Sequence, residues 1–546
     1  MPQIKRNKVE LIKKEKDGFD VLQDLLKYSQ EGDFDAIEKA DREQRFKWFG
    51  VYQQKPNDGH FMLRLRLPGG QINPAQLAGI AKLCKKYARG FSDITTRQTF
   101  QFHWLTISDI KPIFQALASL DIDTQFACGD VPRNVVSCPL AGVIKNEIID
   151  ASNAVTKLAD MYIAAGKQFS NLPRKFKTAI AGCPIHCHQP QINDIGLYGA
   201  ISQKKEKGYG ILVGGGLSRT PHFATPLGVF IKPQQVNPVS KALVEIFREY
   251  GYREKRTRAR LKFLVADKGP DWILQKIEQK IKTKLLKDPS LQHPPAQHQD
   301  HIGTGQQQDG NYFLGIPIGR GRLSHKNMTD IANSAEKYAV NKKRIRLTNK
   351  QNILILDIPQ KNLIHIQEQL AQAGLATKAH PLRDTLVSCT GSEFCNLAVV
   401  ETKHRAGKVL DYLEKNTKLD RPLFISFTGC PNACAQFQIA DIGLTGTIAK
   451  HPTKLNDKNK PLKVDAYNVL LGAGIGADPQ FGEVIAKQIP ATLIHLSIAN
   501  IIDNYYKNRI DDQDAFQSWV SRTPPKTLQK LLQEPTQNPN AVELLA

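Results

Sequence analysis

The stretch TGCPNACAQFQIADIG, from Thr428 to Gly443, nearly occurs twice in this chain. The earlier copy, AGCPIHCHQPQINDIG from Ala181 to Gly196, has the same Cys-Pro-x-x-Cys motif and ends in the same Asp-Ile-Gly. One such match can arise by chance, but a repeat that extends into the surrounding sequence would mean a duplicated fold. Whether both copies bind a metal then decides what the two halves of the chain do.

Three further blocks recur around this motif in the same order, at offsets of roughly 250 residues. DITTRQTFQFHWL (Asp93–Leu105) corresponds to IRLTNKQNILILDI (Ile345–Ile358), SCPLAGV (Ser137–Val143) to SCTGSEFCNLAVV (Ser388–Val400), and YGILVGGGLS (Tyr209–Ser218) to YNVLLGAGIG (Tyr467–Gly476). A period of this length indicates two large copies and not a solenoid. Strand and helix patterns occur in each copy, so we predict an α+β fold that is built twice.

The apolar content and the net charge of the sequence exclude several classes of protein. No run of about 18 apolar residues is present, and the charged N-terminus lacks the apolar core of a secretory signal. We therefore expect a cytoplasmic protein with no membrane segment. The net charge of +23 would suit nucleic acid, an acidic protein or a polyanionic ligand. No nucleic-acid-binding motif accompanies that charge, so we expect no nucleic-acid partner.

The second copy carries two cysteine pairs that suit a metal centre. Cys389 and Cys395 have five residues between them, and Cys430 and Cys434 have three. The chain has nine cysteines, an odd number without any sign of secretion, which favours metal ligands over disulfides. Zinc sites prefer closer pairs, whereas the five-residue loop suits the longer edges of an iron–sulfur cluster.

The first copy lacks one of these four ligands. Cys183 and Cys187 have only Cys138 at the matching upstream place. His186 or His188 could supply a fourth ligand, because imidazole and thiolate are found together in metal sites. We nevertheless expect these cysteines to be structural or vestigial, with no second metal site.

The first copy instead carries cations. Arg64, Arg97, Arg133, Lys175 and Lys177 lie in short segments with apolar neighbours, such as MLRLRL and LPRKFK. Each one alone could be an ordinary surface charge. As a set opposite a redox cluster they predict a pocket for an anion, because guanidinium groups match oxyanions and a desolvated lysine can donate a proton.

With these motifs the chain resembles a known family, the ferredoxin-dependent nitrite and sulfite reductases, which carry sirohaem beside a [4Fe–4S] cluster. The most specific motif is C-x5-C followed by C-x3-C within TGCPNAC, and TTRQTFQFHW, LPRKFK and VGGGLS support it. The resemblance implies a pseudo-twofold fold with paired ferredoxin-like half-domains and two further α/β domains. The expected parts are a helical extension (1–48), the first half-domain (49–125), a sirohaem and substrate domain (126–290), a linker (291–310), the second half-domain (311–380) and a cluster and sirohaem domain (381–546).

The resemblance also implies roles for individual residues. Cys389, Cys395, Cys430 and Cys434 correspond to the cluster ligands, and Cys434 to the ligand shared with the sirohaem iron. The residues that correspond to the anion pocket are Arg64, Arg133, Lys175 and Lys177. Those that correspond to sirohaem contacts are Thr95, Arg97, Gln101, His103, Gly214, Gly215, Gly216 and Arg260.

The resemblance leaves two substrates open. Whole-chain similarity leads us to expect six-electron reduction of nitrite to ammonia, with reduced ferredoxin as donor and a monomeric enzyme. Reduction of sulfite to sulfide is the alternative, since Lys177 adds a cation and since Tyr52 and Cys128 match positions that form a thioether in some sulfite-reducing relatives. A remote alternative is a non-catalytic iron–sulfur or zinc protein that binds nucleic acid, which would explain the charge but not the duplication.

Overall fold

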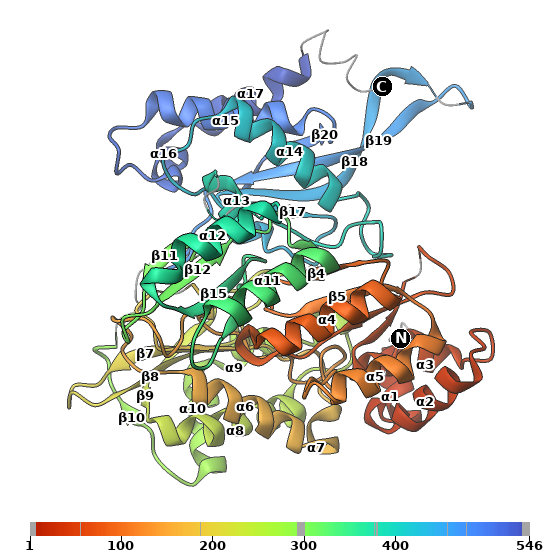
Figure 1. The fold of residues 1–546 in the computed structure, drawn as a ribbon, viewed down its shortest axis with the longest axis vertical. Coiled ribbons are helices and arrows are strands. Elements are labelled where there is room, and N and C mark those ends of the chain that lie inside the picture. The colour runs from red at the N-terminus through yellow and green to blue at the C-terminus, as the bar shows by residue number, and fades with distance from the viewer. Residues whose placement is uncertain are drawn as a thin grey trace.

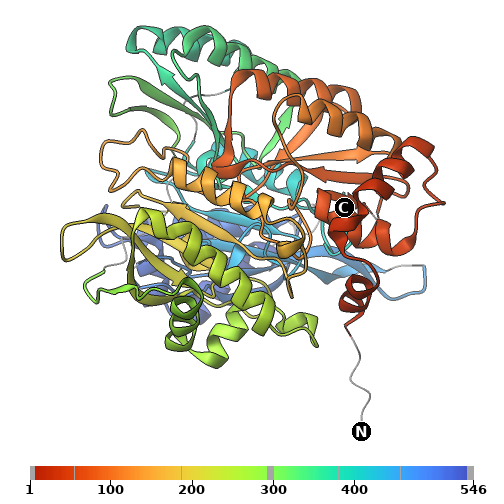
Figure 2. The same ribbon diagram turned by 90° about the horizontal axis from the view of Figure 1, so that it is seen from below.

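The duplicated α+β fold predicted from the sequence is confirmed. The computed structural model describes residues 7–54, 56–185, 187–291, 301–375, 377, 380–455, 457–476 and 478–537. Four five-stranded sheets form in this part of the chain, as two pairs of related topology (Figure 1). Figure 2 shows the paired half-domains along one side of the molecule and the two α/β domains along the other.

The chain opens with helices, as expected for the N-terminal extension. They are α1 (Lys8–Glu15), α2 (Leu22–Glu31) and α3 (Lys39–Glu43), with 3-10 turns at Gly18–Val21 and Arg45–Phe49. Asn7 caps α1 by accepting a hydrogen bond from the Val9 N–H at 3.2 Å. Phe46 and Trp48 then anchor the segment in the core of the first half-domain.

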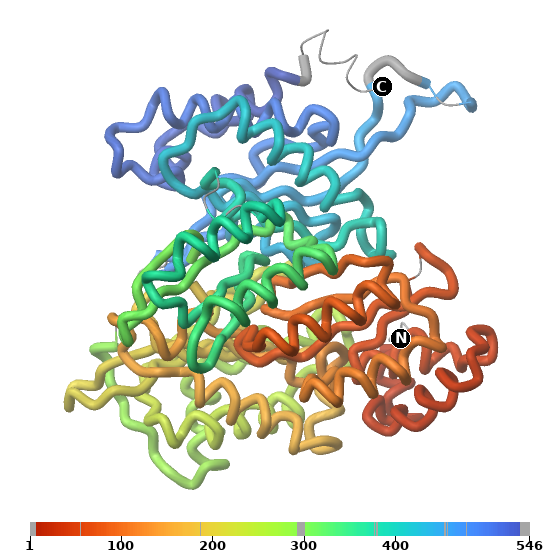
Figure 3. The backbone as a smooth tube through the Cα atoms, viewed as in Figure 1, coloured from red at the N-terminus to blue at the C-terminus, as the bar shows by residue number. Residues whose placement is uncertain are grey.

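The two ferredoxin-like half-domains repeat one strand order. The first sheet runs β1 (Val51–Gln53), β2 (Phe61–Arg64), β5 (Phe100–Leu105), β4 (Phe91–Ile94) and β13 (Arg322–Ser324). The second runs β11 (Gly303–Gln306), β12 (Tyr312–Ile316), β15 (Ile353–Ile358), β14 (Ile345–Leu347) and β3 (Gln71–Ile72). Their helices are α4 (Pro74–Tyr87), α5 (Ile110–Ala118), α11 (His325–Tyr338) and α12 (Leu363–Gln372), and α4 and α11 lie side by side (Figure 3).

Each half-domain lends one strand to the other. β3 belongs to the first half of the chain but pairs with β14, with Ile72 opposite Ile345. In return β13 pairs with β4, and Arg322 stands opposite Asp93. This exchange joins the halves through backbone hydrogen bonds, so they form one body and bring residues about 230 positions apart into contact.

The two α/β domains also share a topology. The first sheet is ordered β10 (Leu286–Lys287), β9 (Thr225–Ile231), β8 (Lys207–Val213), β7 (Ile195–Ile201) and β6 (Thr178–Ala181). The second is ordered β16 (Val387–Ser388), β17 (Ile425–Thr428), β18 (Ile442–Leu455), β19 (Pro461–Leu471) and β20 (Glu483–Pro490). In each, the Cys-Pro-x-x-Cys segment connects a parallel pair, β6 with β7 and β17 with β18.

Helices cover these two sheets. In the first α/β domain they are α6 (Ser152–Ala164), α7 (Lys167–Ser170), α8 (Val236–Tyr250), α9 (Leu261–Lys268) and α10 (Pro270–Ile281). In the second they are α13 (Pro381–Thr385), α14 (Lys403–Asn416), α15 (Ile494–Asn508), α16 (Phe516–Arg522) and α17 (Pro525–Gln533). A small apolar cluster that includes Ile192, Leu217, Ala433 and Phe437 joins the two domains where their cysteine segments meet.

The segment predicted as a linker is partly structured. Residues 303–306 form β11, an edge strand of the second half-domain that pairs with β12, and Gly315 of β12 lets the chain before β11 approach closely. A side chain at Gly315 would meet the His301 carbonyl oxygen at 1.9 Å. In the described ranges, no helix has the length and apolarity needed to cross a bilayer.

Candidate active site

A cavity lies where the half-domains and both α/β domains meet. Its lining combines both copies of the cysteine segment with loops of both half-domains; the residues are Thr96, Arg97, Val136, Lys177, His188, Gln189, Ile192, Asn193, Leu217, Asn349, Ala433, Cys434 and Gln436. Gln189 and Gln436 occupy the same place in the two copies, and their side chains are hydrogen-bonded at 2.6 Å. The two similar stretches therefore face each other, and each supplies one wall.

The first wall, which the first half of the chain supplies, is cationic. The Arg97 guanidinium donates to Asn193 Oδ1 at 3.0 Å and to the carbonyls of Asn134 and Thr178, at 2.5 and 3.2 Å. Burial, with repulsion from Arg133, lowers the pKa of Arg97 to about 9. A guanidinium so crowded by other cations is a strong binding site for carboxylate or oxyanion groups.

Two lysines stand beside Arg97. Burial, with repulsion from Arg174 and Arg260, lowers the pKa of Lys175 to about 7, and its charge also interacts with Cys434. Burial and repulsion from Lys175 lower the pKa of Lys177 well below its usual range. Lys177 lies in the cavity lining, and its backbone N–H donates to Asp194 Oδ2 at 2.8 Å. A lysine with a pKa near 7, such as Lys175, can bind an anion and exchange a proton near neutral pH.

Arg64 and Arg133 are the other two cations expected in the anion pocket. Arg64 donates through Nε to Gln101 Oε1 at 3.0 Å and through Nη1 to Cys128 Sγ at 3.1 Å. Arg133 donates to the carbonyls of Gly129 and Ala127 at 2.7–3.2 Å, and burial lowers its pKa. Both arginines are thus fixed by neighbouring groups before any ligand arrives.

The glycine turn expected at the cofactor is tightly enclosed. Gly214 has a φ of +80°, and a Cβ at Gly215 would meet the Gln191 and Asn193 carbonyl oxygens at 2.4 and 2.7 Å. A Cβ at Gly216 would meet the Arg260 guanidinium at 3.0 Å. The turn can therefore pack this closely, just before the cavity-lining Leu217, only because these positions lack side chains.

Asp194 and Lys262 fix this turn electrostatically. Arg260 Nη2 pairs with Asp194 Oδ2 at 2.8 Å, and both side chains are buried. Lys262 Nζ donates to the carbonyls of Gly216 and Leu217 at 3.2 and 3.1 Å, and burial with repulsion from Arg260 lowers its pKa to about 8. Lys262 was not predicted from the sequence, where one lysine in a basic stretch gives no signal.

The second wall carries the four predicted cluster ligands. Electrostatic interaction with Cys434 helps to raise the pKa of the Cys389, Cys395 and Cys430 thiols, after the larger effect of burial, so the four lie together. Backbone N–H groups point at the sulfurs: Gly429 donates to Cys389 Sγ at 3.2 Å. Cys434 is exposed in the cavity, and its carbonyl accepts a hydrogen bond from Thr96 Oγ1 at 3.0 Å.

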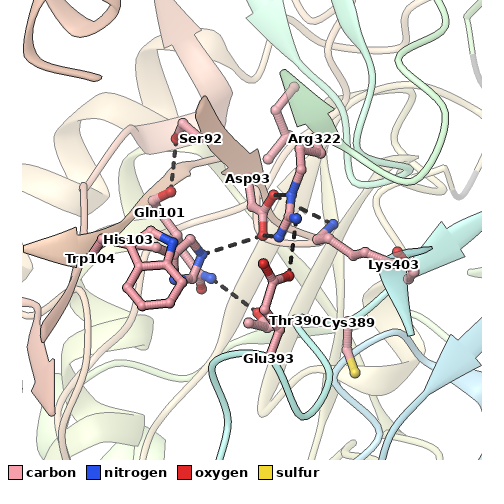
Figure 4. Close-up of polar contacts among 12 residues, drawn as sticks. Ser92, Asp93, Gln101, His103, Trp104, Arg322, Cys389, Thr390, Glu393 and Lys403 are labelled. Atoms are coloured by element: carbon pink, nitrogen blue, oxygen red, sulfur yellow. Dashed lines mark hydrogen bonds and ion pairs between the residues drawn. The ribbon is translucent and has the colours of Figure 1, made fainter. Parts of the chain in front are cut away.

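The Cys389–Cys395 loop is tied to the first half-domain by a buried charge network (Figure 4). Arg322 binds Asp93 Oδ1 at 2.9 Å and Glu393 Oε2 at 3.0 Å, and Glu393 belongs to that loop. Lys403 lies 3.9 Å from Asp93 Oδ1. Burial alone would raise the pKa of Asp93, but Lys403, His103 and Arg322 together hold it well below its usual range.

His103 belongs to this network and not to the cavity lining. Its Nε2 lies 3.3 Å from Asp93 Oδ2, its Nδ1 lies 2.9 Å from Gln54 Nε2, and its ring stacks on Phe394 at 4.0 Å. These contacts make His103 a support of the cluster loop, and its role as a sirohaem contact stays a prediction.

The remaining predicted residues lie between the two walls. Gln101 accepts from Arg64 and donates to Thr390 Oγ1 at 3.3 Å, so it connects the anion pocket with the cluster loop. Thr95 Oγ1 accepts the Arg97 N–H at 3.2 Å and shapes the turn that carries Arg97. The network residues Asp93, Arg322 and Lys403 were missed; a charged residue inside a strand was the available signal for Asp93.

These donor sets fit the two groups that the resemblance implies. Four thiols with convergent backbone N–H groups suit a [4Fe–4S] cluster. The crowded cations of the first wall, whose pKa values are depressed by burial and by one another, suit a macrocycle that bears many carboxylates. Cys434 lines the cavity, between the cysteine group and the cationic wall.

Comparisons with known proteins agree. The family model described as nitrite and sulphite reductase 4Fe-4S domain matches residues 128–285 and 382–539, and that of the nitrite/sulfite reductase ferredoxin-like half domain matches 52–120 and 305–373. A sulfite reductase [ferredoxin] of Mycolicibacterium paratuberculosis is 34% identical, covering 91% of each chain. The ferredoxin–nitrite reductase of Leptolyngbya laminosa is 33% identical over 92% of this chain and 98% of its own.

A solved structure gives the same result in three dimensions. The NirA protein of Mycobacterium tuberculosis superposes with a TM-score of 0.89 at 32% identity, covering 96% of this chain and 97% of that one. With the duplicated fold, the four clustered cysteines and the cationic wall, these matches show that the chain is an enzyme of the ferredoxin-dependent nitrite and sulfite reductase family, whose members carry sirohaem and a [4Fe–4S] cluster.

Proposed function

We propose that this enzyme reduces sulfite to sulfide with six electrons from reduced ferredoxin, in place of the nitrite preference expected from the sequence. The observation that carries the proposal is the position of Lys177 in the cavity lining, beside Arg97 and facing the wall that bears Cys434. The charge of a bound anion favours the protonated form of Lys177, and this further cation at the reacting site favours sulfite, whose dianion carries two negative charges where nitrite carries one.

The bound sirohaem and cluster would supply the electrons and the iron at which the anion is reduced. The protein binds, orients and protonates that anion. Arg64 and Arg133 are held by Gln101 and by loop carbonyls, so little reorganisation is needed when charge moves onto departing oxygen. Lys175, with a pKa of about 7, can give a proton to that oxygen as it leaves as water.

The residues expected at a Tyr–Cys thioether support the sulfite assignment. Cys128 accepts a hydrogen bond from Arg64, and both Cys128 and Tyr52 lie near enough to Arg133 to interact with its charge. Tyr52 and Cys128 therefore both lie beside the anion-binding arginines. We infer that a link between them, where it forms, would fix the position of Arg133.

Nitrite is the second candidate, because relatives named for each substrate are almost equally similar to this chain. The identity is 34% for the mycobacterial sulfite reductase and 33% for the Leptolyngbya nitrite reductase. Ferredoxin as donor suits both cases, since a chain with a net charge of +23 attracts an acidic partner at long range.

Paired kinetics with reduced ferredoxin and each anion test the proposal. We expect a higher kcat/KM for sulfite, and Lys177→Asn should move the ratio about tenfold toward nitrite, since loss of one nearby charge costs the dianion more. Lys204→Asn removes an exposed charge on the β7–β8 turn and should leave the ratio unchanged. A higher kcat/KM for nitrite in the unmodified enzyme would contradict the proposal.

A further inference from the structure

The first copy of the cysteine segment gathers ligand groups of its own. Cys138 Sγ, Cys187 Sγ and a ring nitrogen of His301 all lie within 4.8 Å of one another. Cys138 Sγ stands 3.8 Å from His301 Nε2. Both cysteines are buried and the histidine is half-buried, so the group lies inside the protein with one side toward solvent.

A third thiol adjoins the group. Cys183 is fully buried, and its side chain is in hydrogen-bonding contact with Cys138, which in turn contacts Cys187. The Ile185 N–H donates to Cys183 Sγ at 3.4 Å, as backbone N–H groups do at metal-bound thiolates. Leu354, Leu356 and Phe313 enclose the sulfurs in an apolar shell.

We propose that Cys138, Cys187 and His301 bind one zinc ion, with Cys183 as the fourth ligand. At Zn–S and Zn–N bonds of about 2.3 and 2.0 Å, a tetrahedral site holds a sulfur and a nitrogen about 3.6 Å apart. The 3.8 Å between Cys138 and His301 is close to that value. Three thiolates and one imidazole form a set typical of closed, structural zinc sites.

The distances between the ligand atoms distinguish this site from the cluster site. A cubane needs its thiolates further apart, because four irons and four sulfides lie between them. In the part of the chain that the structure describes, the 4.8 Å span gathers the first-copy group but not the four cysteines of the second copy. Cys138, Cys187 and His301 are therefore spaced for a single ion, and Cys183 would complete the set from its contact with Cys138.

His301 takes the place of the ligand that the first copy lacks. Cys138, Cys183 and Cys187 correspond in the repeat to Cys389, Cys430 and Cys434, but no cysteine of the first copy corresponds to Cys395. His301 comes instead from the chain just before β11, outside the repeat. Of the two histidines considered from the sequence, His188 lies in the cavity lining with Nε2 3.0 Å from the Leu197 carbonyl oxygen, and His186 lies outside the described residues.

The ion would connect two parts of the fold. His301 stands two residues before β11, the edge strand of the second half-domain, while Cys138, Cys183 and Cys187 belong to the first α/β domain. The proposed site is also connected to the cavity, because Asn349 lines the cavity and donates a hydrogen bond to the Cys187 carbonyl oxygen. A zinc ion here would be a structural link, because zinc has no redox chemistry to add to electron transfer.

Metal analysis of the tag-free holoenzyme, purified with its sirohaem and cluster, tests the proposal. We expect about one zinc per chain, and His301→Gln and Cys183→Ser should each lower zinc at least tenfold while iron per chain and the visible spectrum stay unchanged. Cys395→Ser is the matched control and should lose cluster iron but keep zinc.

Unchanged iron and spectrum in His301→Gln show that the variant is folded, so its zinc content is decisive. Zinc absent from the unmodified enzyme, or retained in full by His301→Gln, would overturn the assignment. A disulfide between Cys138 and Cys183, found by mass spectrometry in the native holoenzyme, would overturn it as well.

Discussion

Replacing Asp93 with asparagine should loosen the cluster loop without touching a cluster ligand. Asp93 is 1% exposed and faces Arg322 at 2.9 Å, His103 at 3.3 Å and Lys403 at 3.9 Å. Asp93→Asn keeps the shape of the side chain but leaves Arg322 and Lys403 as buried cations with less compensation. Arg322 also holds Glu393 of the Cys389–Cys395 loop, so the loss is transmitted to the cluster.

The size of the effect follows from these distances. A charge pair about 4 Å apart is worth about 4 kcal/mol at an effective dielectric constant of 20, and desolvation offsets part of this. Since asparagine retains some hydrogen bonding, we expect a net loss of about 3 kcal/mol, which lowers the apparent Tm by about 5 °C.

The pH dependence has a definite sign. The pKa of Asp93 is depressed in the folded chain, so its contribution to stability is present above its unfolded pKa and is lost as pH falls. The difference between the unmodified enzyme and Asp93→Asn should therefore be constant above about pH 5 and shrink below about pH 4.

Thermal unfolding and iron content, measured together, check the prediction. Asp357→Asn is a matched control, because Asp357 is also buried and pairs with Arg344 at 2.9 Å, but in the second half-domain. Both variants should lose stability, and only Asp93→Asn should lose cluster iron on mild heating. Equal iron retention in the two variants would refute the idea that this network supports the cluster loop.

Three further predictions concern the cavity and the donor. Lys175→Gln should lower kcat/KM for nitrite by about 10²-fold; nitrite is the test anion because it stays a monoanion near neutral pH. The variant should also abolish the fall in kcat/KM above about pH 7 that titration of Lys175 produces. An unchanged pH profile would exclude Lys175 as the proton donor. Gly215→Ala places a Cβ 2.4 Å from the Gln191 carbonyl oxygen and should lower the sirohaem content, measured by its red absorption band. In the control Gly228→Ala the new Cβ has no atom within 4 Å, so only the strain of its positive φ should lower the free energy of unfolding, by about 1 kcal/mol. Turnover with ferredoxin should slow as salt rises from about 50 to 300 mM, whereas turnover with methyl viologen should not, and equal slowing with both donors would argue against electrostatic docking.

The sequence was sufficient for the features that depend on spacing within one segment. The cysteine pairs and the LPRKFK lysines could be picked out because each is a short motif, and the resemblance to the family added the glycine turn; their roles stay predictions. The repeat also predicted the duplicated topology, since each copy needs its own strands and helices to bury its apolar residues.

Features that depend on contacts between distant segments could not be predicted. The exchange of β3 and β13 pairs strands of only two and three residues, too short to show alternation. His103 looked like a site residue because of its motif, but its partners Asp93, Lys403 and Phe394 come from two separate segments. His301 lay in a polar stretch whose composition is typical of a linker, and only the fold brings it to Cys138.

The two copies of the opening motif show how a symmetric frame acquired an asymmetric site. The Lys177 N–H donates to Asp194 and the Phe424 N–H donates to Asp441, both at 2.8 Å, so the aspartate of each Asp-Ile-Gly fixes the same backbone position in its own copy. At that position the first copy presents Lys177 to the cavity, whereas the second buries Phe424 completely. Because the backbone hydrogen bond does not depend on the side chain, one copy could specialise in holding an anion while the other kept the cysteines that hold the cluster. The repeated motif therefore accounts for the shape of both walls, and the residues that differ between the copies give the two walls their different chemistry.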